Sequence, residues 1–127
     1  MKIRCECGHV ICDQTDSLPY KCDLLPDDGY WDNIHQPIVD GILDFVKAIA
    51  EDDRSGWLSR HFGAGYPQTL DDSSVISDFI AARMSLGPTA YQCVECGMML
   101  IPNPNSNGYL GFKPIGDDWA GALSWRK

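Results

Sequence analysis

The sequence has no apolar run that approaches the roughly 20 residues needed to cross a bilayer. Its first residues, Met1-Lys2-Ile3-Arg4-Cys5, also lack the apolar core of a secretion signal. These absences argue against a membrane protein and against a secreted one. We therefore expect a cytoplasmic protein that has no membrane partner and whose cysteines stay reduced.

Catalytic motifs are missing as well. The chain contains no nucleophile elbow, no H-E-x-x-H pair and no P-loop. Its three histidines, His9, His35 and His61, share no flanking residues and show no metal-ligand spacing. Paired aspartates such as Asp27-Asp28 fall in turns or at predicted helix ends, where Asp is common for capping reasons. The sequence therefore predicts a protein that is not an enzyme.

Basic residues are scarce relative to acidic ones. Ten Lys and Arg stand against eighteen Asp and Glu, which gives a formal charge of −8. The acidic surplus lies in residues 1–86, because residues 87–127 carry three residues of each sign. Nonspecific affinity for nucleic acid comes from Lys and Arg that displace counterions, so we expect no direct contact with nucleic acid. A basic protein would instead be attracted and steered by this charge.

Cysteine, in contrast, is well represented, and four of the six cysteines form two similar turns. The turns are Cys5-Glu6-Cys7-Gly8 and Cys93-Val94-Glu95-Cys96-Gly97. Two thiolates this close in sequence face one cation only if the chain folds back tightly, and a glycine after the second cysteine permits a positive φ there. Together the turns offer four sulfurs, which is the closed tetrahedral shell typical of structural zinc.

These turns resemble the knuckles of zinc-ribbon and rubredoxin-like proteins, in which two Cys-x-x-Cys-Gly turns on β-hairpins clamp one metal. The resemblance covers residues 5–11 and 91–101. It departs from the pattern twice, because the first turn has one residue fewer between its cysteines and because residues 8–92 separate the two pairs. The resemblance implies a structural metal held by Cys5, Cys7, Cys93 and Cys96. Zinc is the expected ion, and iron suits the same four sulfurs.

The sequence also allows other ligand sets. His9, Cys12 or Cys22 would replace some of the four cysteines in a second set, and disulfides or the absence of any metal are further alternatives. Cys12 and Cys22 lack the Cys-Gly turn. We therefore expect them to act as small buried apolar residues.

The rest of the chain predicts an α+β fold with zinc-ribbon-like β-hairpins and a two-helix insertion between the knuckles. We expect a single domain over residues 1–127. It comprises the first knuckle and strands at 1–25, the helical insertion at 30–87, the second knuckle and a hairpin at 88–115, and a tail at 116–127. An edge strand is predicted at 18–25, and the strand at 109–115 follows the turn at 102–108.

Two helices are predicted within the insertion. The first runs from about Tyr30 to Asp52, with Pro37 as a kink or as the true first turn. The second runs over 73–86 and is entered through Asp71 and Asp72. Residues 54–67 show no clear period, and we interpret them as an aromatic loop that covers the core or contacts a partner. On the first helix, one half of the circumference is apolar and is expected to be core: Ile34, Ile38, Val39, Ile42, Leu43, Phe45, Val46 and Ile49.

Acidic residues on the opposite side of this helix and directly after it predict a binding surface for a basic protein. Its candidate residues are Asp40, Asp44, Glu51, Asp52 and Asp53. Small size, acidity and expected location are similar to those of bacterial immunity proteins, a resemblance that implies an inhibitor which neutralises a basic toxin such as a nuclease. The alternative is a zinc-ribbon adaptor within transcription, translation or RNA machinery.

Overall fold

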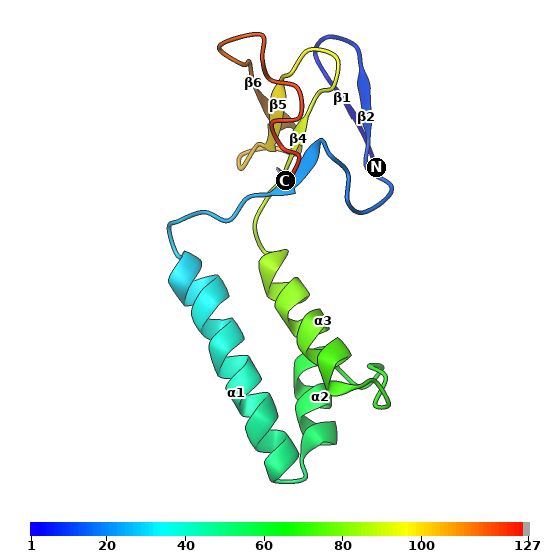
Figure 1. Ribbon diagram of the computed structural model, residues 1–127, viewed down its shortest axis with the longest axis vertical. Helices are drawn as coiled ribbons and strands as arrows, with labels where there is room; N and C mark the ends of the chain where they lie inside the picture. The colour runs from blue at the N-terminus through cyan, green and yellow to red at the C-terminus, as the bar shows by residue number, and fades with distance from the viewer. Residues whose placement is uncertain (126–127) are drawn as a thin grey trace. The chain divides into compact units, whose positions relative to one another are not determined.

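The computed structural model describes residues 1–125, and in this part of the chain it contains three α-helices, one π-helical turn and two antiparallel sheets (Figure 1). The predicted α+β class is confirmed. The chain divides into two units. The β unit consists of Met1–Leu24 together with the chain from Gly87 onward, and the helical unit is Leu25–Leu86.

The β unit is built from strands of three or four residues. β1 (Lys2–Arg4) pairs with β2 (Val10–Cys12) in an antiparallel hairpin. The second sheet has the order β3-β4-β5-β6 and comprises β3 (Lys21–Asp23), β4 (Thr89–Gln92), β5 (Met99–Pro102) and β6 (Tyr109–Phe112). β3 lies at the edge of this sheet, as predicted, but it covers only residues 21–23 of the predicted strand at 18–25. β6 ends three residues earlier than the predicted strand at 109–115.

The hairpin and the four-stranded sheet share one apolar core. The middle residue of each three-residue hairpin strand points inward, which buries Ile3 and Ile11. The sheet contributes Tyr91 and Leu100, and Met98 lies beside them. Two of the knuckle cysteines are buried in the same cluster. Hydrophobic packing therefore brings the two knuckle-bearing hairpins together.

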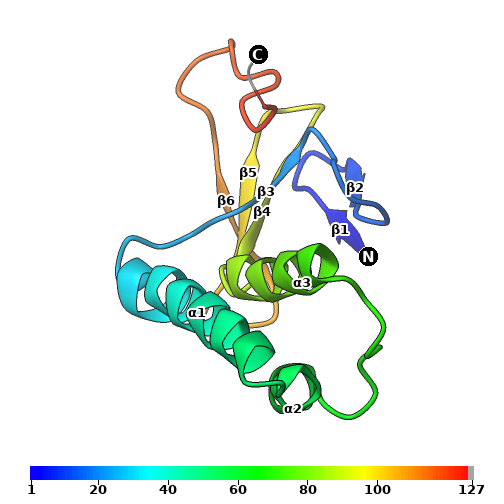
Figure 2. The ribbon, with the colours of Figure 1, turned by 60° about the horizontal axis from the view of Figure 1, so that its bottom comes forward.

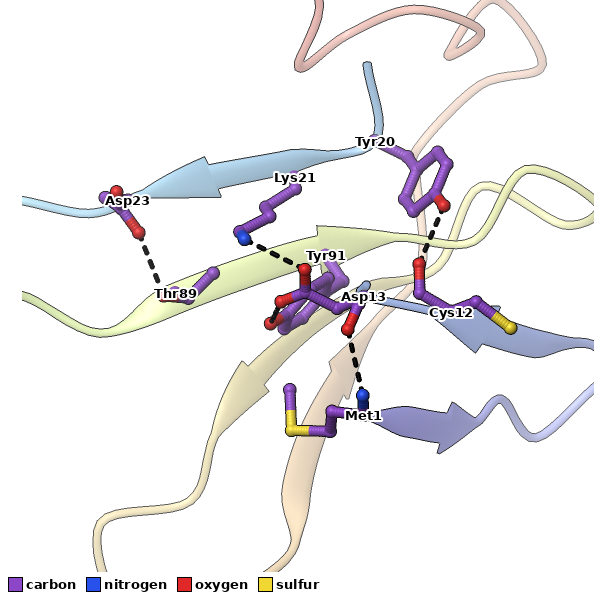
Figure 3. Close-up of polar contacts among 8 residues, drawn as sticks. All are labelled: Met1, Cys12, Asp13, Tyr20, Lys21, Asp23, Thr89 and Tyr91. Carbon is purple, nitrogen blue, oxygen red and sulfur yellow. Dashed lines mark hydrogen bonds and ion pairs between the residues drawn. The ribbon is translucent and has the colours of Figure 1, made fainter. Parts of the chain in front are cut away.

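Polar contacts around Asp13 add to this packing (Figure 3). The Asp13 carboxylate accepts from the Lys21 ammonium at 2.9 Å and from the Tyr91 hydroxyl at 2.5 Å. The amino group of Met1 donates to the Asp13 carbonyl at 2.9 Å. The Tyr91 hydroxyl, followed by Lys21, lowers the pKa of Asp13. One carboxylate at the end of β2 thus ties the hairpin to β3 and β4.

In the helical unit, the first predicted helix exists but begins differently. A π-helical turn, η1 (Trp31–His35), leads directly into α1 (Gln36–Ala50). Pro37 lies in the first turn of α1, where its missing N–H and its ring are tolerated. The N–H of Gln36 donates to the Trp31 carbonyl, a wider spacing than the α-helical one. The π turn therefore lets one continuous helical segment pass through the proline.

The predicted loop at 54–67 is wrong in its first part. Residues Arg54–Phe62 form α2, so the insertion contains three α-helices rather than two. The segment contains glycine and serine and has a weak apolar period, so its sequence favours no helix by itself. Trp57 and Leu58 are buried in the core of the unit. Tertiary packing, which a local pattern does not reveal, stabilises this helix.

α3 (Asp72–Met84) begins one residue before the predicted helix and ends two residues before its predicted end. The Asp71 carboxylate accepts from the Ser74 N–H at 2.8 Å and so caps the helix. α1 contacts both α2 and α3, and Figure 2 shows α3 crossing beside α1. The shared core of the helical unit is Phe45, Ala48, Trp57, Leu58, Val75 and Phe79.

The apolar half of α1 is only partly buried. Ile34 and Phe45 are core, as predicted. In contrast, Val39, Leu43, Val46 and Ile49 are exposed, so their predicted core position is wrong. The neighbouring helices pack on the narrow stripe formed by Gly41, Phe45 and Ala48 and leave the flank of the apolar half uncovered. Within residues 1–125, no helix is long and apolar enough to cross a membrane.

Candidate metal centre

The two knuckles adopt the same hydrogen-bonding pattern despite their different lengths. In the first, the Gly8 N–H donates to the Cys5 carbonyl at 2.9 Å, and the Cys5 N–H donates to the His9 carbonyl at 2.8 Å. In the second, the Gly97 N–H donates to the Cys93 carbonyl and the Cys93 N–H to the Met98 carbonyl, both at 2.8 Å. The first knuckle has one residue fewer between its cysteines, which shortens the turn but leaves the hydrogen bonds at both of its ends the same.

Both knuckle glycines have the positive φ that the sequence predicted. The φ angles are 96° at Gly8 and 77° at Gly97. A side chain is strained in this conformation, so glycine allows each turn to reverse directly after its second cysteine.

The four knuckle cysteines converge on one point. The Sγ atoms of Cys5, Cys7, Cys93 and Cys96 all lie within 4.8 Å of one another. The Cys5–Cys96 and Cys7–Cys93 sulfur pairs are each 3.6 Å apart. A disulfide requires about 2.05 Å, and all six cysteines are free. Metal–sulfur bonds of about 2.3 Å arranged tetrahedrally place sulfurs about 3.8 Å apart. This four-cysteine cluster therefore has the dimensions to hold a metal ion.

The four cysteines are buried to different degrees, and the pKa values of their thiols differ accordingly. Burial raises the pKa of Cys5 to about 12 and also raises the pKa of Cys93. The backbone N–H of His9 lowers the pKa of Cys7, which is exposed. Buried thiolates are costly unless a positive charge lies beside them. A cation held between the four sulfurs would supply that charge.

The residues of the alternative ligand set do not join the cluster. The metal-binding group found among residues 1–125 contains neither His9 nor Cys12 nor Cys22. Cys12 is exposed, so its predicted burial is wrong; it occupies the outward position that follows Ile11 on β2. Cys22 is half-buried on β3, and burial raises its pKa.

One supporting residue was not predicted from the sequence. The ring of Trp119 covers Gly97, and a Cβ at Gly97 would lie 2.4 Å from the ring atom Cδ2. The side chain of Gln92, at the end of β4, donates to the Trp119 carbonyl at 3.1 Å. The tail, which the sequence left unassigned, thus packs on the second knuckle. No local period links residue 119 to this knuckle, and the only signal was the presence of tryptophan in the tail.

The exposed side of the cluster borders a surface hollow. The hollow has a volume of about 410 Å³, and its wall includes Cys7, Cys96, Lys113 and Trp119. Solvent and chelators therefore have access to the cluster from the side of Cys7.

The predicted partner-binding residues lie in the helical unit and are all exposed. Asp40 and Asp44 lie on α1, and Glu51 and Asp52 follow its last residue. Asp53 precedes α2 and pairs with Arg60 at 3.1 Å. In the described part of the chain, the other four make no ion pair. They are not part of the metal-binding group.

Comparisons with known proteins identify a family. The model of the family described as Domain of unknown function (DUF8617) matches residues 1–116, which include both knuckles and the whole helical unit. No curated protein and no solved structure matches the chain.

Proposed function

We propose that this chain, which belongs to the DUF8617 family and whose matched region includes all four knuckle cysteines and the acidic helices, is a non-enzymatic protein-binding module. A structural zinc ion held by Cys5, Cys7, Cys93 and Cys96 stabilises the module. Its helical unit binds a basic protein. Four sulfurs from the protein fill a tetrahedral shell and leave no position for a substrate, which supports a structural ion.

The distribution of charge between the two units carries this proposal. Leu25–Leu86 contains eleven of the eighteen acidic residues and four of the ten basic ones. The β unit is nearly balanced, with seven acidic and six basic residues. The acidic surplus therefore belongs to the helical unit and not to the chain as a whole. Such a surface attracts basic proteins and repels phosphate backbones.

The end of α1 provides further support. The carbonyl end of a helix favours cations, yet Glu51 and Asp52 stand there. Asp52 also has a positive φ of 56°, a conformation that glycine adopts most readily and that Asp tolerates better than most residues. The carboxylates of Glu51 and Asp52 oppose the helix dipole, whereas Lys47 in the last turn of α1 favours it. Residues that break a local rule in this way are often kept for binding.

The partner that suits this chemistry best is a basic toxin, and the protein is then an immunity-type inhibitor that acts in the cytoplasm. Inhibitors of this kind act by covering the active site of the toxin, and electrostatic attraction speeds their association. A reducing compartment is consistent with six free cysteines.

The first test is metal analysis of protein purified without chelator. About one zinc ion per chain is expected, and iron would be recognised by its colour. Protein without any bound metal would contradict the structural ion.

The second test measures association with the basic protein encoded by a neighbouring gene, at several ionic strengths. The rate should fall steeply as salt rises. The variant D40N/D44N/E51Q should slow association, whereas the matched variant D16N/D117N/D118N, with three changes at exposed positions of the β unit outside the knuckles, should leave it unchanged. Equal effects of the two variants, or a rate independent of salt, would contradict the proposal. Co-purified RNA or polymerase would instead favour the zinc-ribbon adaptor.

A further inference from the structure

α1 carries an exposed apolar stripe that no part of the helical unit covers. Its members are separated by three or four residues: Val39, Leu43, Val46 and Ile49. Leu43 is 62% exposed and Val46 57%. Residues at this spacing lie along one face of a helix, and ten residues span about 15 Å. The stripe is therefore long enough to receive about three turns of another helix.

The stripe and the acidic residues lie side by side on the solvent side of α1. At about 100° per residue, Gly41, Phe45 and Ala48 mark the buried side. The apolar stripe occupies one flank of this buried side and the acidic residues Asp40, Asp44 and Glu51 occupy the other. The two flanks approach each other on the side opposite the core, where Leu43, Lys47 and Asp40 follow one another around the helix. The acidic flank thus carries three carboxylates against the single ammonium of Lys47.

Trp31 extends the apolar surface toward the start of the helical segment. Its side chain is 62% exposed, and its ring contacts His35 edge-on at a centroid distance of 4.5 Å. Large aromatic residues that are held in place while exposed are typical anchors of protein interfaces. Exposed apolar surface of this extent is unfavourable in water unless something covers it.

The charge of the helical unit decides between a second copy and a different partner. Two copies packed through this stripe would bring two acidic flanks close together, and each helical unit has eleven acidic and four basic residues. Like charges facing each other across an interface are unfavourable. A basic segment would gain attraction from the same flanks.

We infer that the basic partner docks on the apolar stripe of α1 through an amphipathic helix whose apolar face is bordered by Lys or Arg. This inference rests on the proposed function and adds the site and the form of the bound segment. The partner's apolar side chains pack between Val39, Leu43, Val46 and Ile49, as helices do when they lie in apolar grooves. Its cations face Asp40, Asp44 and Glu51.

The test uses two synthetic peptides of Leu and Lys with the same composition. One places Leu at helical spacing on a single face, and the other scrambles the order. Both are labelled with a fluorophore and titrated with the intact chain at about 0.15 M salt. We expect the amphipathic peptide to bind about tenfold more tightly than the scrambled one, because only its apolar face covers the stripe.

The variant L43S/V46S should remove this tenfold preference and leave binding of the scrambled peptide unchanged. Its helicity is checked first, and both side chains are exposed enough for the fold to persist. The matched variant L110S/F112S changes two exposed apolar residues of β6 and should keep the preference.

Each other outcome overturns the inference in a distinguishable way. Equal binding of both peptides, falling with salt, would refute the apolar stripe while leaving the basic partner in place. The absence of binding to either peptide at low salt would refute the basic partner as well. Sedimentation that finds a dimer for the native chain and a monomer for L43S/V46S would assign the stripe to a second copy.

Discussion

Gly8 and Gly97 follow the second cysteine of their knuckles and share a positive φ, but their surroundings differ. A Cβ at Gly8 would meet no atom within 4 Å, whereas a Cβ at Gly97 would overlap the ring of Trp119. Alanine substitutions at these two glycines therefore distinguish two destabilising effects. One is the backbone strain that any side chain suffers at this φ, and the other is displacement of the tail.

We predict that Gly97→Ala weakens the metal centre more than Gly8→Ala. The strain alone costs roughly 1–2 kcal/mol at each site, and only Gly97→Ala also displaces Trp119. Chelator competition on the purified variants measures the difference. In a Trp119→Ala background the two substitutions should become equal. A difference that persists in this background would mean that the ring does not support the knuckle.

His61 is a titratable residue of the helical unit that packs against aromatic rings of the core. Its ring lies 4.2 Å from that of Trp57 and 5.5 Å from that of Phe79, measured between centroids. Burial lowers the pKa of His61, and Arg60 and Arg83 act in the same direction, while Asp44 opposes them. The folded protein therefore holds this histidine neutral at a pH where the unfolded chain already binds a proton.

Keeping His61 neutral therefore contributes fully to the stability of the fold above the ordinary histidine pKa of about 6.5. This contribution is lost as the pH falls toward the lower pKa that His61 has in the folded protein. We predict that the urea midpoint, followed by helical circular dichroism, falls between pH 7 and pH 5. The urea midpoint of His61→Phe should fall less over the same interval, and that of the control His9→Asn should fall as much as that of the native chain. An equal fall for His61→Phe would show that another group is responsible.

At the scale of elements, α1 and α3 meet at a glycine. A Cβ at Gly41 would lie 2.1 Å from the Phe79 ring atom Cζ, so only glycine lets the two helices approach this closely. Two effects compete when Gly41 is replaced by alanine. The gain in helix propensity is about 1 kcal/mol, and the cost of overpacking a core is about 1–3 kcal/mol.

We predict that Gly41→Ala destabilises the helical unit by about 1 kcal/mol, because Phe79 is nearly buried and has little room to move. Urea unfolding of the native chain, both single variants and Gly41→Ala/Phe79→Leu forms a double-mutant cycle. In the Phe79→Leu background, Gly41→Ala should cost less or should stabilise. Additive effects would indicate that the helices shift apart without cost.

The elements also illustrate what a local pattern reveals. The strong apolar period of α1 and the aspartates before α3 predicted both helices. α2 was missed because Trp57 and Leu58 acquire their helical setting from contacts with Phe45 and Phe79. The exposure of Leu43 and Val46 was missed for a related reason. A helical wheel identifies an apolar half, but the width of the buried part depends on which helices pack against it.

At the scale of the whole molecule, the four-cysteine cluster is assembled from the two distant parts of the sequence that form the β unit. The ligands were predictable because each knuckle carries its own Cys-Gly signature. The support from Trp119 was not predictable, because it depends on where the tail lies. The Asp13 contacts likewise join residues that no spacing rule connects.

We predict that Cys96→Ser releases the metal and unfolds the β unit. The free energy of binding a structural zinc ion is about 10–16 kcal/mol in small domains, which is as large as the usual total stability of a domain, about 5–15 kcal/mol. Cys12→Ser should retain both metal and fold, because Cys12 is exposed and outside the cluster. Metal content and the dispersion of amide resonances provide the measurement. Equal damage from both substitutions would favour the ligand set that includes Cys12.

The position of the helical unit between the two knuckles also dictates an order of events during translation. Cys5 and Cys7 leave the ribosome first, but their partners Cys93 and Cys96 follow only after the complete helical segment Leu25–Leu86 has been synthesised. The nascent chain therefore cannot complete the four-sulfur shell until the three helices have emerged. Helices rely on contacts close in sequence and form quickly. The acidic binding unit is thus available to fold before the ion is captured, and metal loading is the final stage of maturation.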